Sequence, residues 1–497
     1  MSVTADEILE GLDEQQRKAV VTLQGPVRII AVAGAGKTRT ITRRIAYACA
    51  TGAWKQDLVL AVTFSVKAAA EMRSRLEQLG VENATVATFH SAALTQLRDV
   101  WEDVTDAPFP HVINDEVSCM SRALKRVEHV SFEPNTMSLQ ALLAEVSWCK
   151  VQLIAQEDYA QACKVDNRRP PLGLKPEEFA QIYTAYELEK TAGHEIDFND
   201  ILLMTCNVLE EYKDAAAKIR SKIGYVTVDE YQDVSPLQHR LMQLWLGSNT
   251  NICVVGDPAQ TIYSFAGASS FYLLNFHEEF KNMQADIHLQ TDYRSTAPIV
   301  AAANKVLKKS SQREDYIRLY ANMKSGKSVE KTKYPDDISE ARAIAKRIVQ
   351  LRFSGEKTSN CAVLTRINSQ QQVIAHALAE AGLQYIFRSD SSRRESAVGY
   401  NPNIDVALEK IGFSRDTGVN ISTIHAAKGL EFKHVFIIGC SDGLIPYNAT
   451  EDLEVLEEER RLLYVGITRA ERFLYLSYAE RKTSSDSFIR SASRFLL

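Results

Sequence analysis

The feature that most constrains the fold of this chain is a run of small residues between an apolar segment and a helical pattern. The run is Ala31-Val32-Ala33-Gly34-Ala35-Gly36-Lys37-Thr38, and a helical pattern over residues 39–49 follows it. A strand, a loop of small residues and a helix N-terminus form a P-loop, whose backbone N–H groups surround phosphates. Lys37 is placed to reach the β- and γ-phosphates of a nucleotide, and Thr38 to bind Mg²⁺. Ala31 stands where the general motif has glycine, so a plain strand-to-helix turn is the alternative.

Short apolar segments alternate with helical patterns along most of the chain, which is typical of an α/β fold with parallel sheets. The predicted strands are Val27–Val32, Leu58–Thr63, Tyr225–Val228, Ile252–Val255, Ala362–Leu364 and Val435–Ile438. Most are apolar at consecutive positions, which indicates strands covered by helices on both faces. Residues 93–190 differ, because they show helical spacing without strand signals and a loop at residues 168–173. A last short helix is expected after the polar residues 482–487.

The length of 497 residues suits about three domains. We expect a nucleotide-binding domain of residues 1–92 and 191–284, a helical insertion of residues 93–190, and a second α/β domain of residues 285–497. The net charge of −5 excludes a uniformly basic protein of the histone type. It does not exclude nucleic-acid binding, because a basic groove can lie on an acidic body.

The eight cysteines occur without a CxxC or similar spacing, so free thiols in a reducing compartment are expected and a zinc site is not. The N-terminal residues are acidic and lack the apolar core of a signal peptide. No apolar run approaches the roughly 20 residues that span a bilayer. These features predict a cytoplasmic protein without a membrane partner.

Two acidic residues follow the predicted strand at residues 225–228. Asp229 is placed to hold Mg²⁺ through water, and Glu230 to orient and activate the water that attacks a phosphate. Hydrolysis also needs cations near the charge that develops on the γ-phosphate, and Arg294 and Arg469 are the candidates. Taken singly, the acids could cap a helix and each arginine could form a surface salt bridge. The P-loop favours the catalytic interpretation of the acids.

These motifs, in their order along the chain, resemble those of the superfamily 1 helicases of the UvrD/Rep/PcrA type. The matching segments are residues 12–20, 31–38, 61–72, 87–91, 229–233, 255–263, 293–294, 423–432 and 458–470. In this family the P-loop normally begins with alanine, as it does here. The sequence of residues 256–265 is similar to the corresponding motif in a second class of actinobacterial UvrD-type helicases. The resemblance implies two RecA-like parallel-sheet motor domains, with the helical insertion in the first.

The resemblance also implies an ATP site that both motor domains build, with Mg²⁺ as its metal. The P-loop residues that would hold the nucleotide are Ala33, Gly34, Ala35, Gly36, Lys37 and Thr38. The resemblance implies that Gln16 recognises the adenine and that Tyr293 stacks on it, with Arg39 alongside. It implies that Glu431 contacts the ribose or phosphates and that Gln260 senses the γ-phosphate. Arg294 and Arg469 would clamp the γ-phosphate.

The same resemblance implies a groove for single-stranded DNA, in which aromatic rings stack on bases and short polar side chains contact phosphates. The residues carried over are Thr63, Phe64, Thr88, His90, Phe265, Thr423 and His425. We expect Phe64 to be exposed at the edge of the sheet. Taken singly, such a phenylalanine is more often a core residue, and such a threonine a helix cap. The family commonly has Trp-Arg-Gly-Ala where this chain has Phe265-Ala266-Gly267-Ala268, so a ring is smaller and an arginine is missing.

UvrD-type enzymes carry a large helical insertion, the 2B domain, where this chain has only the 30 residues 389–418. An independent domain needs about 50 residues, so none is expected here. The resemblance implies an ATP-dependent 3′→5′ translocase and helicase that acts on single-stranded and 3′-tailed duplex DNA, in DNA repair or related metabolism. A protein partner would replace the missing domain. The alternative is an ATP-switched DNA-binding subunit, as in an antiphage defence complex, that unwinds only with a partner.

Overall fold

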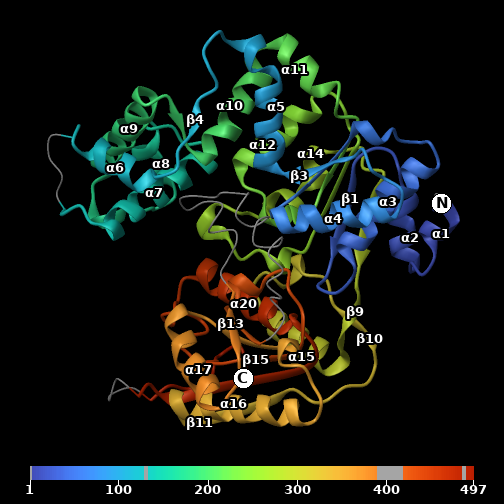
Figure 1. The fold of residues 1–497 in the computed structure, drawn as a ribbon, viewed down its shortest axis with the longest axis vertical. Coiled ribbons are helices and arrows are strands. Elements are labelled where there is room, and N and C mark those ends of the chain that lie inside the picture. The colour runs from blue at the N-terminus through green and yellow to red at the C-terminus, as the bar shows by residue number, and fades with distance from the viewer. Residues whose placement is uncertain (1–2, 128–131, 389–417, 484–488, 497) are drawn as a thin grey trace.

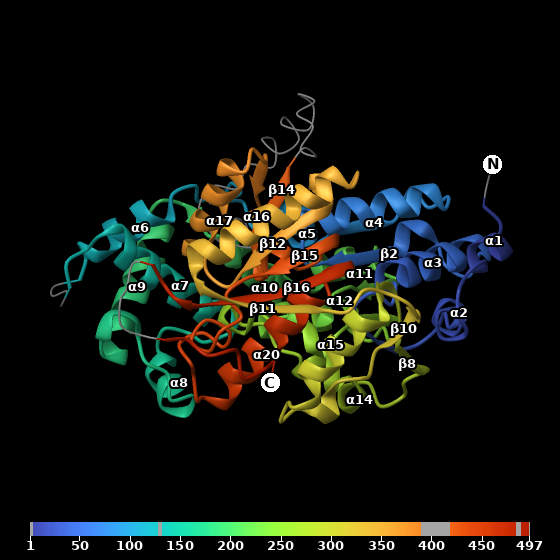
Figure 2. The same ribbon diagram turned by 90° about the horizontal axis from the view of Figure 1, so that it is seen from below.

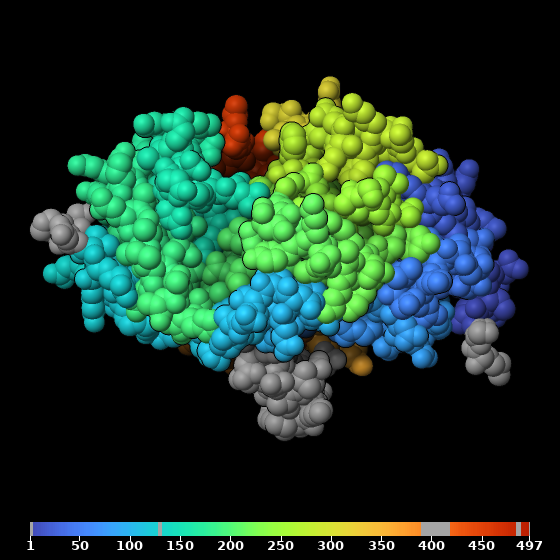
Figure 3. Space-filling view, turned by 90° about the horizontal axis from the view of Figure 1, so that it is seen from above, coloured from blue at the N-terminus to red at the C-terminus, as the bar shows by residue number. Residues whose placement is uncertain are grey.

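The computed structural model describes residues 3–127, 132–388, 418–483 and 489–496, and its main feature is a pair of parallel β-sheets (Figure 1). Each sheet has six strands and belongs to its own α/β domain, which confirms the predicted fold class. A helical subdomain lies beside the first sheet domain, on the side away from the N-terminal helices (Figures 1 and 3). Seen from below, the second sheet domain covers part of the first (Figure 2).

The first sheet has the strand order β3-β2-β6-β7-β1-β8, with every pairing parallel. Its strands are β1 (Val27–Ala31), β2 (Val59–Thr63), β3 (Thr85–Thr88), β6 (Tyr225–Val228), β7 (Ile252–Gly256) and β8 (Ala285–Leu289). β1 lies between β7 and β8, with Val27 opposite both Cys253 and Ala285. Because parallel strands end at the same edge of a sheet, the loops after β1, β2, β6 and β7 meet there.

Alternate residues of these strands face two different layers of helices, as the two-residue period of a strand requires. Ile29 and Val255 pack in one apolar cluster with α2 (Glu14–Val21), α3 (Lys37–Ala50) and α4 (Val66–Gln78). Val228 and Val254 pack in a second cluster with α5 (Phe89–Val104), α10 (Phe198–Glu211), α11 (Lys213–Arg220) and α12 (Pro236–Leu246). The strands are therefore covered on both faces, as their continuous apolar runs predicted.

The second sheet has the order β11-β16-β15-β12-β14-β13, again entirely parallel. Its strands are β11 (Glu330–Asp336), β12 (Cys361–Thr365), β13 (Tyr385–Phe387), β14 (Val419–Thr423), β15 (Phe432–Ile437) and β16 (Ala470–Arg481). One face packs against α16 (Asp337–Phe353) and α17 (Asn368–Glu380). The other packs against α15 (Ala297–Lys308) and α20 (Leu453–Ile467), in an apolar cluster shared with the first domain.

A few short elements complete the two sheet domains. The strands β9 (Thr291–Thr296) and β10 (Tyr320–Met323) pair with each other where the chain passes into the second domain. The remaining helices of the first domain are α1 (Ala5–Leu9), α13 (Phe271–Leu274) and α14 (Phe276–Glu279).

The helical subdomain has a core of its own, formed by α6 (Glu116–Leu124), α7 (Thr136–Val151), α8 (Tyr159–Val165) and α9 (Pro176–Ala192). Two features differ from the sequence prediction. The region contains a strand, because β4 (His111–Val112) pairs with β5 (Glu195–Ile196) where the chain enters and leaves the subdomain. Residues 93–104, expected in the insertion, lie in α5 and pack against α10 and α11, so the core of the helical subdomain begins nearer residue 111.

The C-terminal predictions have different outcomes. The expected last helix is absent from the described residues 489–496, where Ala492 instead forms a β-bridge with Ser441. Residues 389–417, most of the segment predicted to stand in place of a 2B domain, lie outside the described residues. Within the described part of the chain, no helix is both long and apolar enough to cross a membrane.

Candidate ATP and DNA sites

The P-loop connects β1 to α3 at the carboxyl edge of the first sheet. Gly34 and Gly36 have φ angles of +74° and +77°, a left-handed conformation that glycine adopts without strain. A Cβ atom on Gly34 would lie 2.0 Å from Asp292 Oδ1, so no larger residue fits there. α3 starts directly after Gly36, so the unpaired N–H groups of its first turn face the loop. This backbone geometry suits phosphates, and Ala31 at the end of β1 lies outside it.

Acidic residues at the end of β6 lie next to the P-loop. Lys37 Nζ is 3.2 Å from Glu230 Oε2, and Thr38 Oγ1 donates a hydrogen bond of 3.4 Å to Asp229 Oδ2. Burial raises the pKa of Asp229 to about 7. Burial also acts to raise the pKa of Glu230, but the Lys37 and Lys428 ammonium groups outweigh it and lower that pKa to about 2. Glu230 is therefore ionised, and Thr38 and Asp229 offer the oxygen ligands that Mg²⁺ prefers.

Glu230 adopts a strained backbone conformation. Its φ of +52° lies in the left-handed region, which costs a non-glycine residue about 1–3 kcal/mol and is concentrated at functional sites. The Gln232 Nε2 amide donates to Glu230 Oε2 at 2.6 Å, the same oxygen that Lys37 contacts. The other carboxylate oxygen accepts no hydrogen bond from any residue that the structure describes, so it is available to a water molecule.

Gln16, Arg39 and Tyr293 lie on one side of the P-loop. Gln16 Nε2 donates to the Ala35 carbonyl oxygen at 3.0 Å, and Gln16 Oε1 accepts from the Asp13 backbone N–H at 3.2 Å. The Tyr293 hydroxyl donates to Asp13 Oδ2 at 2.6 Å, and this tyrosine is 39% exposed. Arg39 donates to a backbone carbonyl of the loop before α2 at 3.1 Å. The residues predicted to hold adenine thus come together, with the Gln16 amide bonded to the protein itself.

Arg469 lies in the cleft between the two sheet domains and is only 2% exposed. Its guanidinium donates to the carbonyl oxygens of Val465 and Leu430, both at 3.0 Å, and to Gln260 Oε1 at 3.5 Å. Burial and the nearby charge of Arg294 lower its pKa to about 10, so it remains a cation at neutral pH. Because Gln260 belongs to the first domain, this contact crosses the cleft.

Arg294 and Glu431, both predicted to contact the nucleotide, contact each other in this structure. Arg294 Nη2 lies 2.5 Å from Glu431 Oε2. Asp292 positions the turn that carries Arg294, because its Oδ1 accepts the backbone N–H groups of Arg294 and Ser295 at 2.7 and 3.0 Å. The same carboxylate packs against Gly34. Asp292 is therefore a site residue that the sequence analysis did not identify.

Lys428 links the second domain to three places on the first. Its ammonium group pairs with Asp233, donates to the Gln260 carbonyl oxygen at 2.6 Å, and lies 4.9 Å from the centre of the Tyr263 ring. The sequence predicts no role for Lys428, although this residue lies within the matching segment 423–432. Its partners show that it holds the segment that connects the two candidate sites.

Helix α20 of the second domain makes further contacts with the same segment. They are a hydrogen bond of 3.1 Å from the Tyr464 hydroxyl to Asp257 Oδ2, one of 2.7 Å from Arg461 Nε to the Thr261 carbonyl oxygen, and one of 3.1 Å from the Ser264 backbone N–H to Glu458 Oε1. Any change in the cleft therefore acts on residues 257–264 at several points.

A cavity of about 570 Å³ lies between the first sheet domain and the helical subdomain. The predicted DNA residues that line it are Thr63, Phe64, Thr88, His90 and Phe265. Three buried polar atoms of lining residues have no hydrogen-bond partner within the described part of the chain, namely Thr63 Oγ1, His90 Nε2 and Asp233 Oδ1. Buried polar atoms are rarely unpaired in proteins, so this wall suits a polar ligand.

The aromatic rings predicted to stack on DNA lie at one end of this cavity. Phe64 is half-buried rather than exposed as expected, because its ring stacks on that of Tyr263 with centroids 5.7 Å apart. Phe265 is 54% exposed. The His425 ring does not line the cavity but lies 6.0 Å from the Phe265 ring. The two domains thus place rings side by side at the mouth of the cleft.

The short polar residues of this set have mixed outcomes. Thr88 Oγ1 accepts the Ser91 backbone N–H at 3.2 Å and caps α5, and Thr423 Oγ1 accepts the Ala426 backbone N–H at 3.2 Å. These hydroxyls therefore have the local role that was the alternative for them. Burial lowers the pKa of His90 to about 3, so this residue is neutral at physiological pH.

Two further aromatic residues line the cavity and were not identified from the sequence. Phe198 stacks on His90 with ring centroids 3.9 Å apart. Trp148, from α7 of the helical subdomain, lines the opposite part of the cavity. Both lie in ordinary helical patterns, so only the folded chain shows that their rings reach this space.

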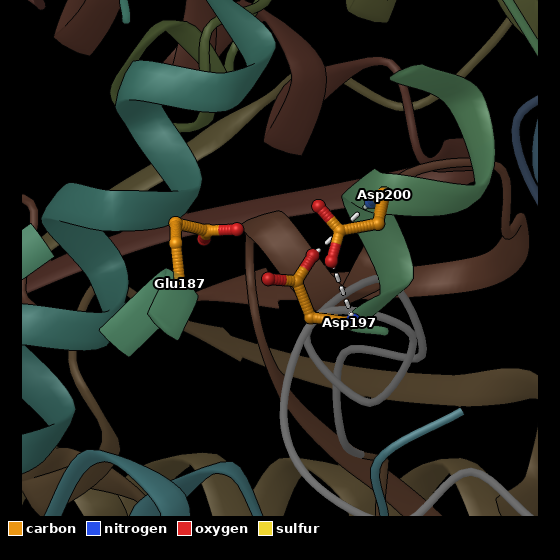
Figure 4. A group of neighbouring side chains, drawn as sticks. All are labelled: Glu187, Asp197 and Asp200. Atoms are coloured by element: carbon orange, nitrogen blue, oxygen red, sulfur yellow. Dashed lines mark hydrogen bonds between the residues drawn. The ribbon is translucent and has the colours of Figure 1, made fainter. Parts of the chain in front are cut away.

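A group of three carboxylates lies beside the cavity, formed by Glu187, Asp197 and Asp200 (Figure 4). The geometry could hold a metal ion, but two buried ammonium groups lie within it. Lys150 Nζ is 2.6 Å from Asp197 and 2.8 Å from Glu187, and Lys190 Nζ is 2.7 Å and 3.0 Å from the same residues. The cluster is therefore an ion-pair network that fastens α7 and α9 to the start of α10.

We expect Lys150→Met to lower the free energy of unfolding by about 3–5 kcal/mol, because it leaves the three carboxylates with Lys190 as their one remaining ammonium partner in the cluster. Chemical denaturation followed by circular dichroism measures the change. The matched control is Lys222→Met, which breaks only an exposed pair with Asp99 and should cost about 0–1 kcal/mol. Equal effects of the two substitutions would contradict a stabilising role of the network.

Comparison with known proteins agrees with this geometry. Residues 12–281 match the UvrD/REP helicase N-terminal domain, and residues 287–392 and 405–481 match the UvrD-like helicase C-terminal domain. The chain is 34% identical to the ATP-dependent DNA helicase UvrD2 of Mycobacterium tuberculosis, over 100% of this chain and 82% of that protein. It is 26% identical to the ATP-dependent DNA helicase PcrA of Bacillus subtilis, over 97% of this chain and 85% of that protein. The chain therefore belongs to the UvrD/REP family of ATP-dependent DNA helicases.

Proposed function

We propose that this helicase is a 3′→5′ translocase on single-stranded DNA, which opens and closes the cleft between its sheet domains with each ATP hydrolysed. The proposal rests on the position of the segment 257–265, which reaches both candidate sites. It contacts Arg469 through Gln260 and lines the DNA cavity through Tyr263 and Phe265. The polarity, and a role in DNA repair or related metabolism, rest on the family resemblance.

For hydrolysis, Glu230 would accept a hydrogen bond from the attacking water on its free oxygen and direct the water at the γ-phosphorus, as the bond to the β–γ bridging oxygen breaks. Arg469 and Arg294 would balance the negative charge that grows on the phosphate oxygens. Mg²⁺ held by Thr38 and Asp229 would supply further positive charge at the β- and γ-phosphates.

For movement along DNA, Gln260 and Lys428 would couple ATP hydrolysis to a shift of the DNA-binding residues. Gln260 lies between Arg469 and Asp257, to whose Oδ2 it donates at 2.7 Å. Lys428 holds the backbone of Gln260 and the face of Tyr263 at once. A change in the contacts of Gln260 after hydrolysis would therefore shift the Tyr263 ring against the DNA.

The short segment 389–418 stands where UvrD-type enzymes have the 2B domain, and we expect this difference to affect strand separation rather than translocation. The alignment with UvrD2 extends over 583 positions, more than the 497 residues of this chain, so that relative has internal residues with no counterpart here. Translocation needs only the ATP cleft and the strand groove, which the two sheet domains and the helical subdomain supply. We therefore propose efficient translocation, with unwinding of 3′-tailed duplexes that is weak without a partner protein.

An unwinding assay on 3′-tailed, 5′-tailed and blunt duplexes, with ATPase measured in parallel, tests the proposal. We expect ATPase that requires Mg²⁺ and is stimulated by single-stranded DNA, translocation seen by stopped-flow with end-labelled strands, and limited unwinding of the 3′-tailed duplex only. Unwinding from 5′ tails would contradict the polarity. Stimulated ATPase without translocation would favour the ATP-switched binding subunit instead.

We expect Phe64→Ala to weaken the binding of single-stranded DNA by about 1–3 kcal/mol, the range for one stacked base. Basal ATPase should persist, because Phe64 contacts Tyr263 rather than the P-loop. Fluorescence anisotropy and ATPase assays measure the two quantities, and Phe64→Tyr, which keeps the ring, serves as the control. Loss of basal ATPase in the alanine variant would mean that Phe64 acts mainly as a core residue.

A further inference from the structure

The wall of the cavity that faces the two sheet domains comes from α7 of the helical subdomain, and its largest ring is Trp148. The chain has four tryptophans. Those at positions 101 and 245 donate their indole N–H to Ala107 and Gln96, whereas Trp148 donates to no residue that the structure describes. Trp148 is also only half-buried. It therefore offers the cavity an aromatic surface, and its indole N–H is not used by another described residue.

A half-buried arginine and two buried residues behind it fix the position of the Trp148 ring. The Arg168 guanidinium lies over it, 3.6 Å from its centre. Arg168 is itself held by two hydrogen bonds of 2.7 Å to the two oxygens of Glu145, and the Tyr159 hydroxyl donates to Glu145 at 2.7 Å. A ring held in this way loses little conformational entropy when a ligand stacks on it.

The opposite wall is held at a fixed distance by a tight backbone contact. Gly267 follows Phe265 and Ala266, and a Cβ atom at Gly267 would lie 2.7 Å from Val151 Cγ2 at the end of α7. Its φ of +87° also requires glycine. The loop that carries Phe265 therefore rests directly on the helix that carries Trp148, so the two aromatic walls stay in register.

The chemistry of the lining favours a nucleobase over a phosphate. No lysine or arginine occurs among the described residues that line the cavity, whereas Glu116, Asp197 and Asp233 do. Asp197 is already paired with Lys150 and Lys190, which leaves Glu116 and Asp233 Oδ1 as the acceptors. Carboxylates repel phosphate anions but accept hydrogen bonds from the amino and imino groups of bases. Asp233 Oδ1 and Thr63 Oγ1 are nine-tenths or more buried and unpaired within the part of the chain described, as expected for atoms that await such a partner.

We propose that Trp148 is a DNA-binding residue, on which a base of the single strand stacks between the helical subdomain and the ring of Phe265. This inference rests on the proposed function, because it concerns the same strand. It also gives a reason why this chain functions with a phenylalanine and an alanine at positions 265 and 266. Trp148 supplies ring area from the other wall. Occupancy of the cavity by a base would then clamp the helical subdomain against the first motor domain.

The test compares Trp148→Leu with Trp148→Phe in the full chain without nucleotide. The probes are a labelled oligothymidylate and a strand of equal length whose central nucleotides are abasic. We expect Trp148→Leu to weaken oligothymidylate binding about 5- to 150-fold, the equivalent of one stacked base, and to leave binding of the abasic strand unchanged. Trp148→Phe should recover part of the loss, because a smaller ring still stacks.

Tryptophan fluorescence provides a second readout that does not depend on the leucine variant being stable. A base stacked on Trp148 should quench emission of the wild-type chain, and Trp148→Phe should remove that component. Equal weakening on both strands, unchanged binding by Trp148→Leu, or unchanged quenching in Trp148→Phe would each overturn the inference. Failure of the wild-type chain to bind oligothymidylate would instead overturn the proposed function.

Discussion

Replacing Glu230 with glutamine should reduce steady-state ATP turnover by at least about 10²–10⁴-fold, the contribution of a positioned general base. Glutamine keeps the size of the side chain and can keep the contact with Lys37, but it cannot accept a proton from water. ATP affinity should be retained, because the P-loop backbone and Lys37 are unchanged. Steady-state ATPase with single-stranded DNA, and titration with a fluorescent ATP analogue, measure the two quantities.

Glutamine is the appropriate substitution at position 230, because alanine would also remove the contacts with Lys37 and Gln232. Glu380→Gln provides a matched control, because Glu380 pairs with Arg342 on the surface of the second domain. Normal turnover in the Glu230 variant would show that another group activates the water. Loss of ATP binding would show that ATP binding itself requires the Glu230 carboxylate.

Replacing Arg469 with alanine should lower turnover by about 10³–10⁵-fold, the range for an arginine that stabilises phosphoryl transfer from another domain. The expected loss in ATP affinity is far smaller, since the charge that Arg469 balances grows mainly in the transition state. Arg294→Ala should act in the same direction. Turnover and ATP affinity are again the quantities to measure, and a matching loss in affinity with normal maximal turnover would contradict the assignment.

Arg469 also has a structural role, which its control must separate from catalysis. Its removal takes one donor from the Leu430 carbonyl oxygen and one from the Val465 carbonyl oxygen, which still accepts the Thr468 hydroxyl. Arg469→Lys keeps a positive charge but not the planar set of donors. Thermal stability of the lysine and alanine variants close to that of the wild-type chain, with strongly reduced turnover in both, would assign the effect to chemistry rather than to folding.

The sequence predicted six of the twelve strands in the two sheets, because a parallel strand buried on both faces is a continuous apolar run, and it did not predict β3, β8, β11, β13, β14 and β16. The six predicted strands agree with β1, β2, β6, β7, β12 and β15 to within a few residues. Residues 93–104 were expected in the insertion, because α5 has the same helical period as the helices of the subdomain. In the folded chain α5 packs against α10 and α11 of the first domain.

The candidate site was predictable where chemistry and local context coincide, as in the P-loop. It was not predictable where a side chain matters through partners far along the chain. Lys428 gains its importance from Asp233 and Gln260, more than 160 residues away in sequence. Thr88, which was predicted to contact DNA, lines the cavity and also caps α5, a local role that its position in the motif did not reveal.

Because the described residues of the cavity wall include no cationic side chain, DNA binding in this cavity should have its own dependence on salt concentration. Proteins that bind DNA through many phosphates displace a shell of counterions, and their affinity falls steeply as salt is added. A strand held mainly by stacked bases and neutral donors displaces few. The part of the DNA affinity that comes from this cavity should therefore vary little with ionic strength, because releasing a base from it requires few cations to return to the DNA.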